Sequence, residues 1–305
     1  MTGGRAAEWG GRSAERDARA AGQAVRAVER RAAGGPTDAR GGGATWRLDL
    51  AYEGTAYRGW AKQPGQVTIE GVLEEALATV VRERVRLSVA GRTDAGVHAW
   101  AQVASFSCAC PDLEPRQLRR SLNALLPSDI GVLRVVREPP AFVAREATSR
   151  TYEYDVWTTP VKPVRERAFV WALRGGVDGA TLAATAELLP GIRDFAALTP
   201  SAHLYRSCVR EVAAAAWTDE GPTPDGEGRR LRFRVTAGSF LHNMVRVAVG
   251  SMIDVAQGRM TVQEFEEALA AGERRRMGQT APARGLALVA VGYAPPPALT
   301  RRGSA

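Results

Sequence analysis

The alternation of apolar and polar positions predicts a series of short β-strands. A period of two residues is typical of a strand that buries one face. Seven segments follow this period closely enough to predict strands: residues 46–52, 85–90, 101–108, 151–157, 209–217, 231–237 and 286–293. The polar stretch 218–229 is expected to be a loop between two of them.

Apolar residues recur at helical spacing between these strands. The pattern predicts helices over residues 68–84, 115–126, 181–189 and 240–256. A fifth helix is expected to begin after Thr261, because Thr261 and Glu264 have the spacing of a capping box. Its inner face would carry Val262, Phe265 and Leu269. Strands and helices mix in a similar order in two halves of the chain, which favours a two-part α+β architecture.

The ends of the chain differ in composition from its middle. Residues 1–45 are rich in Gly, Ala and Arg and contain almost no large apolar side chains, so we expect a disordered extension. Residues 46–147 and 148–294 form the two predicted α+β halves, and residues 295–305 form a flexible tail. No continuous apolar run approaches the ~18 residues of a membrane span, and no signal peptide is recognisable. A cytoplasmic protein without membrane contact is therefore expected.

The charge of the chain suggests the class of its partner. Lys and Arg total 41 against 33 Asp and Glu, giving a net charge of +8. Lys62 and Lys162 are the only lysines, and this arginine bias indicates a GC-rich genome. The net positive charge favours a polyanionic partner, most often a nucleic acid.

Several kinds of chemistry are disfavoured by missing motifs. Phosphate-binding glycine loops and a serine nucleophile elbow are absent. The cysteines Cys108, Cys110 and Cys208 are too few for a disulfide framework, and Cys108 and Cys110 lack a second pair for a typical zinc site. We expect no metal and no cofactor.

One loop concentrates residues suited to chemistry. Gly-Arg-Thr-Asp-Ala-Gly-Val-His at residues 91–98 follows a predicted strand, and its glycines let Asp94 project from a tight turn. The neighbouring Arg92 would favour the ionised carboxylate, which suits a nucleophile. The alternative is structural, because an aspartate in a turn often accepts hydrogen bonds from its own backbone.

Arg246 is the second unusual residue. It lies in a largely apolar predicted helix, where a buried arginine requires a partner or the edge of a cleft. The alternative is an arginine whose charged end reaches the surface. Tyr152 lies on a predicted strand, where a core position is the ordinary role. His98, His203 and His242 do not cluster in sequence and are expected to be structural.

Beyond these arguments, the chain resembles the TruA-type tRNA pseudouridine synthases over residues 46–293. The most specific block is residues 91–98, followed by Gln102 and Phe106. Further blocks occur in the same order as in the family, at residues 52–60, 63–64, 123–127, 129–130, 142–145, 150–154, 194–195, 240–250, 281–282 and 285–286. Val143 and Ala287 depart from the family pattern, where histidine and tyrosine are often found.

The resemblance implies a fold, an activity and a set of site residues. The fold would be that of pseudouridine synthases, with two similar α+β halves and antiparallel sheets around a central basic cleft. Asp94 would be the nucleophile, Tyr152 would stack on the target uridine, and Arg246 would pair with Asp94. Arg92 would help to hold the nucleotide turned out of its stack. No cofactor would be required.

The substrate implied by the resemblance is the anticodon stem-loop of tRNA, at positions 38, 39 and/or 40, and the enzyme would act as a homodimer. Two other functions remain open. A non-catalytic RNA-binding module with two RRM-like halves would explain the charge and the aromatic strands, but it would not explain the Asp94 loop. A glycosidase would need a second carboxylate in the cleft, and no candidate stands out in the sequence.

Overall fold

The computed structural model describes residues 43–110 and 113–293. Most of the extension predicted for residues 1–45 lies outside these ranges, as do all residues after 293, including the predicted tail 295–305. The described part is an α+β structure built on one sheet of ten strands, which confirms the predicted fold class.

Eight strands form the main row of the sheet. Their order is β4-β1-β3-β10-β5-β9-β8-β7, and every pairing between neighbours is antiparallel except that of β10 with β3. The strands are β1 (Ala44–Tyr52), β3 (His98–Cys108), β4 (Ile130–Glu138), β5 (Ser149–Thr158), β7 (Gly191–Asp194), β8 (Val209–Pro222), β9 (Arg229–Ala237) and β10 (Leu286–Gly292). Two short strands, β2 (Ser88–Val89) and β6 (Trp171–Leu173), pair with β3 and β5 beside this row.

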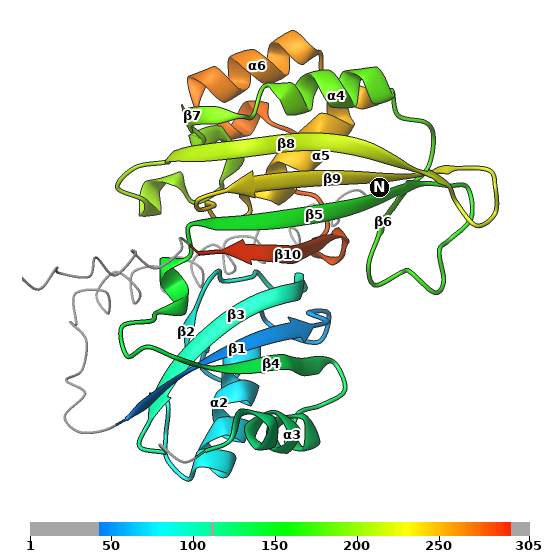
Figure 1. Ribbon diagram of the computed structural model, residues 1–305. Helices are drawn as coiled ribbons and strands as arrows, with labels where there is room; N and C mark the ends of the chain where they lie inside the picture. Colours follow the sequence, from blue (N-terminus) through cyan, green and yellow to red (C-terminus); the bar gives the residue numbers. More distant parts are fainter. Residues whose placement is uncertain (1–42, 111–112, 294–305) are drawn as a thin grey trace, which may run out of the picture.

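The last strand of the described chain lies at the middle of the sheet. Strand β10 pairs in parallel with β3 and antiparallel with β5, so it joins the strands of the two predicted halves (Figure 1). The two halves therefore share one continuous sheet. The division of the chain between residues 147 and 148 stays a prediction.

Five α-helices occur in the described ranges, and they form two groups. Helices α2 (Ile69–Val81) and α3 (Pro115–Leu125) lie with β1, β3 and β4. Helices α4 (Gly179–Glu187), α5 (Met244–Ala256) and α6 (Val262–Ala271) lie at the other end of the sheet with β8 and β9 (Figure 1). Among the residues that the structure describes, no helix is long and apolar enough to span a membrane.

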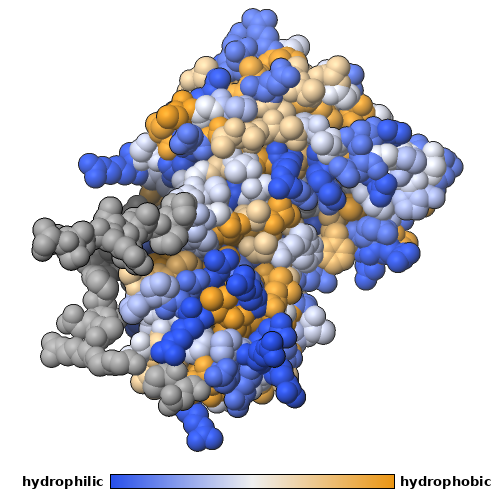
Figure 2. Space-filling model, in the orientation of Figure 1, coloured by the Kyte–Doolittle hydropathy of each residue, from blue (hydrophilic) through white to orange (hydrophobic). Residues whose placement is uncertain are grey.

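The two faces of the sheet differ as strand periodicity requires. On β5, Tyr154 and Val156 alternate with Glu153 and Asp155, and the apolar members are buried in the core. The polar members form ion pairs with arginines of β9: Asp155 with Arg232, and Glu153 with Arg234. Figure 2 shows hydrophilic residues gathered at the right-hand end of the molecule, where the β8–β9 hairpin and the β5–β6 connection lie.

Most elements begin and end close to the predicted positions, and three have clearly different bounds. The strand expected over residues 85–90 is reduced to Ser88–Val89, and the helix expected from Phe240 begins only at Met244, after Asn243 takes a left-handed φ of 59°. Strand β8 continues to Pro222, so the loop expected from residue 218 is shorter than predicted. These last residues of β8 are mostly exposed, and they are held by backbone pairing with β9 rather than by an apolar pattern.

Strand β4 was not predicted from the sequence. Its buried residues are Ile130, Val132 and Val135, which breaks the period of two. The break has a structural cause, because the register of β4 against β1 shifts between Asp49 and Leu50. A bulge of this kind inserts one residue and moves the following side chains to the other face.

Candidate active site

The loop that carries Asp94 is packed directly on the segment that follows β1. A Cβ atom at Gly54 would lie 2.0 Å from the carbonyl oxygen of Val97, and one at Gly59 would lie 2.8 Å from that of Thr93. Gly59 also has a φ of 88°, a conformation that favours glycine. These two glycines are required because the two backbones touch, which explains why the sequence block 52–60 accompanies the Asp94 loop.

Hydrogen bonds hold the loop at both of its ends. The Trp60 N–H donates to the carbonyl oxygen of Thr93 at 3.0 Å, and the hydroxyl groups of Tyr52 and Thr93 lie 2.8 Å apart. The side-chain amide of Gln102 donates to the Gly91 carbonyl at 2.7 Å and to the Tyr52 hydroxyl at 3.1 Å. After Asp94, the Gly96 N–H donates to the Tyr57 carbonyl oxygen at 3.3 Å, so the backbone on both sides of Asp94 is fixed by the N-terminal half of the chain.

The Asp94 carboxylate itself accepts no hydrogen bond from the residues that the structure describes. It is about one-third exposed, at 29%. Arg246 Nη1 lies 3.9 Å from one of its oxygens, Oδ2, and His242 Nε2 lies 3.8 Å from the other, Oδ1. The structural alternative required backbone hydrogen bonds to this carboxylate, and the described residues supply none.

Arg246 is held in place by its own half of the chain. Its Nε donates to the carbonyl oxygen of Ala281 at 2.8 Å, and its Nη1 donates to Asn243 Oδ1 at 2.7 Å. The side chain is only 18% exposed, so the arginine does not reach the open surface. Its long contact with Asp94 joins α5 to the loop before β3.

Tyr152 lies between these two sides of the site. It is buried on β5, with its ring edge-on to Phe240 at a centroid distance of 5.1 Å. Its hydroxyl lies beside Gly91, 3.6 Å from where a Cβ would be, and makes no hydrogen bond within the described ranges. Burial raises the pKa of Tyr152, and the nearby Tyr52 and Asp94 side chains raise it further, so the hydroxyl is neutral at pH 7.

Arg92 forms no ion pair with Asp94 in the described structure. Its side chain is exposed, and it forms no hydrogen bond or ion pair with any residue that the structure describes. Its charge acts instead on Glu70, whose pKa is raised mainly by burial and is lowered in part by Arg92. Three of the four predicted site residues therefore converge, and Arg92 lies at the rim.

His242 was missed by the sequence reasoning, which treated all three histidines as structural. Its place four residues before Arg246 is a helical spacing, but His242 lies ahead of α5, so that spacing carries no signal. His98 does have a structural environment: its Nδ1 accepts a hydrogen bond from the Gly54 N–H at 3.0 Å, and burial lowers its pKa. His203 is exposed.

The described residues contain one group that could hold a metal ion. Ligand atoms of Glu83, Cys108 and Cys110 lie within 4.8 Å of one another. Burial raises the pKa of the Cys110 thiol to about 12, so this thiol is protonated at neutral pH without a metal. Cys108 ends β3, ten residues and about 34 Å from His98 at the start of that strand. The group is therefore remote from Asp94.

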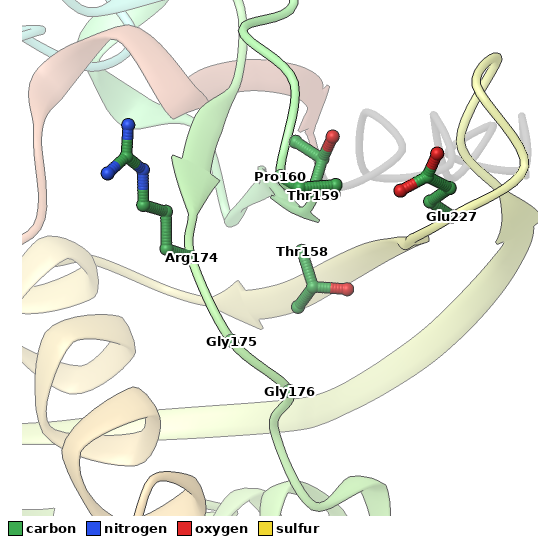
Figure 3. A pocket seen from close by; sticks show the side chains of 7 residues that line it. All are labelled: Thr158, Thr159, Pro160, Arg174, Gly175, Gly176 and Glu227. Carbon is green, nitrogen blue, oxygen red and sulfur yellow. The ribbon is translucent and has the colours of Figure 1, made fainter.

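A cavity beside the ends of β5 and β6 is also separate from Asp94. It has a volume of about 570 Å³ and is lined by Thr158, Thr159, Pro160, Arg174, Gly175, Gly176 and Glu227 (Figure 3). Thr158 lies six residues along β5 from Tyr152, or about 20 Å. No predicted site residue lines this cavity.

Comparison with known proteins identifies the family. A family model described as "tRNA pseudouridine synthase" matches residues 50–144 and 185–294. A protein of Chloroflexus aurantiacus named "tRNA pseudouridine synthase A" is 42% identical over 260 residues, which cover 84% of this chain and 91% of that protein. A protein of the same name from Pelobacter propionicus is 37% identical over 82% of this chain and 99% of its own length.

The chain belongs to the tRNA pseudouridine synthase family, a family of isomerases, as the sequence resemblance indicated. A further protein named "tRNA pseudouridine synthase A", from Solidesulfovibrio magneticus, is 40% identical over 83% of this chain and 92% of its own. Among solved structures, a dye-decolorizing protein from V. cholerae aligns with 81% of this chain and 91% of its own. The TM-score of this alignment is 0.17 and the sequence identity is 10%.

Proposed function

We propose that this chain isomerises uridine to pseudouridine in tRNA, at positions 38, 39 and/or 40 of the anticodon stem-loop, with Asp94 as the nucleophile. The observation that carries the proposal is the setting of Asp94. Its carboxylate projects from a rigid loop, accepts no hydrogen bond in the described ranges, and has a nitrogen donor group about 4 Å from each oxygen. Its lone pairs are therefore available to form a bond to carbon.

The reaction rearranges bonds within one nucleotide and needs no oxidant. Asp94 attacks the sugar or the base, the bond between N1 and C1′ breaks, and the uracil turns. A new bond then forms between C5 and C1′, Asp94 is released, C5 loses its proton and N1 gains one. No atom is gained or lost, in agreement with an isomerase.

Tyr152 and Arg246 have roles that follow from their positions. The buried ring of Tyr152 offers a face for stacking beside the Asp94 loop, and its hydroxyl is placed to take part in moving the C5 proton. Because burial keeps that hydroxyl neutral, its oxygen accepts a proton only as its own proton leaves. Arg246 places a positive charge 3.9 Å from Asp94 Oδ2, beside the attacking carboxylate.

The remaining assignments concern recognition and assembly. Exposed Arg92 would contact the nucleotide after it has turned out of the stem, since a stacked base is out of reach of Asp94. The net charge of +8 favours binding along the tRNA phosphates. We also infer that the enzyme is a cytoplasmic homodimer, as the resemblance to the family implies, so that the second subunit can bind the rest of the tRNA.

Asp94→Asn tests the proposal. Asparagine has nearly the same shape, but its neutral amide cannot attack carbon, so single-turnover formation of pseudouridine should fall by at least ~10⁴, or about 5 kcal/mol of barrier. The dissociation constant for tRNA should change little, because phosphate contacts dominate affinity. A variant that folds, binds tRNA and still makes pseudouridine at the wild-type rate would end the assignment of Asp94.

Asp178→Asn is the matched control. Asp178 caps α4 by accepting from the Thr181 N–H at 2.9 Å, and asparagine caps a helix about as well. This variant should therefore keep wild-type activity. Wild-type protein that binds tRNA and makes no pseudouridine would favour the RNA-binding module, and release of free uracil would favour a glycosidase.

A further inference from the structure

His242 stands against the proposed nucleophile, and nothing in the predicted site accounts for it. It lies just before α5, on the side of Asp94 not occupied by Arg246. Its Nε2 is 3.8 Å from Asp94 Oδ1, whereas Arg246 Nη1 is 3.9 Å from Oδ2. Each oxygen of the carboxylate therefore faces its own nitrogen group.

The imidazole of His242 is held from behind by a single segment of chain. Its Nδ1 lies 2.9 Å from the hydroxyl oxygen of Ser201, a side chain that is itself buried. The backbone N–H of His242 donates to the hydroxyl oxygen of Tyr205 at 2.9 Å. Ser201 and Tyr205 flank the 3₁₀ turn Ala202–Leu204, so this turn sets the direction in which the ring points.

The two neighbours of the ring, Ser201 and Asp94, together favour one tautomer of His242. A neutral imidazole has one N–H donor and one acceptor nitrogen, and a serine hydroxyl can donate to the acceptor. The Ser201 hydroxyl oxygen forms no other hydrogen bond in the described ranges, so its hydrogen is available for Nδ1. The Asp94 carboxylate on the other side of the ring can only accept, so the tautomer with its proton on Nε2, facing Asp94, suits both neighbours.

We propose that His242 is a positioning residue that donates from Nε2 to Asp94 Oδ1 and, with Arg246 on Oδ2, fixes the plane of the attacking carboxylate. The inference rests on the function proposed above. A shift of less than 1 Å brings 3.8 Å to hydrogen-bond distance, and such contacts commonly tighten when substrate binds. The carboxylate then meets the nucleotide in one orientation, which raises the rate without adding to affinity.

A set of variants separates positioning from packing. His242→Leu keeps bulk and removes the donor, so single-turnover pseudouridine formation should fall about tenfold to a hundredfold, with the tRNA dissociation constant unchanged. His242→Gln returns an N–H donor near the Nε2 position and should restore most of the rate. Ser201→Ala should slow the reaction less than His242→Leu, because the ring stays in place but its proton is no longer directed.

His203→Leu is the matched control. His203 lies in the 3₁₀ turn Ala202–Leu204 that follows Ser201, but its side chain is exposed and has no part in the site. It should retain the wild-type rate. Equal losses in His242→Leu and His242→Gln, or a wild-type rate in His242→Leu, would overturn the proposal. Thermal melting of each variant identifies any loss that comes from unfolding.

A measurement independent of turnover decides the same point. Long-range ¹H–¹⁵N correlation spectra of protein labelled on its three histidines report the tautomer of each ring. We expect the Nε2–H form for His242, a shift of its Nε2 signal in Asp94→Asn, and a mixture of tautomers in Ser201→Ala. An Nδ1–H form would overturn the inference. Wild-type protein without activity would instead overturn the proposed function, and the spectra would still report on His242.

Discussion

Arg150→Met should destabilise the junction of the two halves. Arg150 is buried on β5 and forms no ion pair with any described residue. Its guanidinium instead donates five hydrogen bonds to four backbone carbonyls, those of Ala90, Arg145, Ala147 and Gly238. Ala90 directly precedes the Asp94 loop, so this one side chain ties the loop to the strand that carries Tyr152.

The size of the effect follows from these bonds. The bonds to Ala90 and to Ala147 are buried, whereas those to Arg145 and Gly238 are partly buried, where water can replace the lost donor. A buried carbonyl left without a partner costs about 1–3 kcal/mol. Methionine keeps much of the packing and removes the unfavourable burial of a charge, which offsets part of the loss. We expect a decrease of about 3 kcal/mol in the free energy of unfolding.

Urea denaturation followed by circular dichroism measures this change, provided that the dependence on urea concentration stays the same. Arg150→Lys keeps the charge but offers donors from a single nitrogen, so its loss should be intermediate. Arg234→Met is the control, because Arg234 is exposed and its ion pair with Glu153 contributes at most about 1 kcal/mol. An Arg150→Met protein within 1 kcal/mol of the wild type would refute the role of Arg150 as the link.

Two further predictions concern a tyrosine and a histidine. Tyr152→Phe should leave stability and tRNA affinity unchanged, because the Tyr152 hydroxyl has no hydrogen-bond partner among the described residues. It should slow single-turnover pseudouridine formation at least tenfold, and a wild-type rate would remove the hydroxyl from the reaction. Burial lowers the pKa of His98 below its usual 6.5, so the unfolded chain binds a proton first and the free energy of unfolding should decrease as the pH falls below about 6.5. His98→Asn keeps an acceptor for the Gly54 N–H but removes the titrating ring. Urea titrations at pH 7.5 and 5.5 should then show a smaller loss of unfolding free energy than in the wild type. An unchanged loss would show that other groups cause it.

Local interactions were predictable from the sequence. Helix α6 begins where the spacing of Thr261 and Glu264 indicated, and both hydrogen bonds of the capping box are present. Thr68 likewise caps α2 through the Gly71 N–H. These partners are three residues apart, so the residues that decide each helix start all lie within one turn.

The candidate site was predictable only in part. The glycines around Asp94 marked its loop, and the apolar neighbours of Arg246 indicated that this arginine needed a partner. The residues alone did not identify Asp94 as that partner, and the family resemblance did. His242 carried no local signal, because its ring contacts are with Ser201 and Asp94, which are distant in the chain.

The sequence by itself determined which segments become helices and most of those that become strands, because side-chain periodicity and caps act over a few residues. It did not determine that β10 lies between β3 and β5. Strands pair through backbone groups that all residues share, so a strand's neighbours leave no period in its own sequence. Packing of the whole chain made that choice, and the same packing brought Arg246 and His242 to the two oxygens of Asp94.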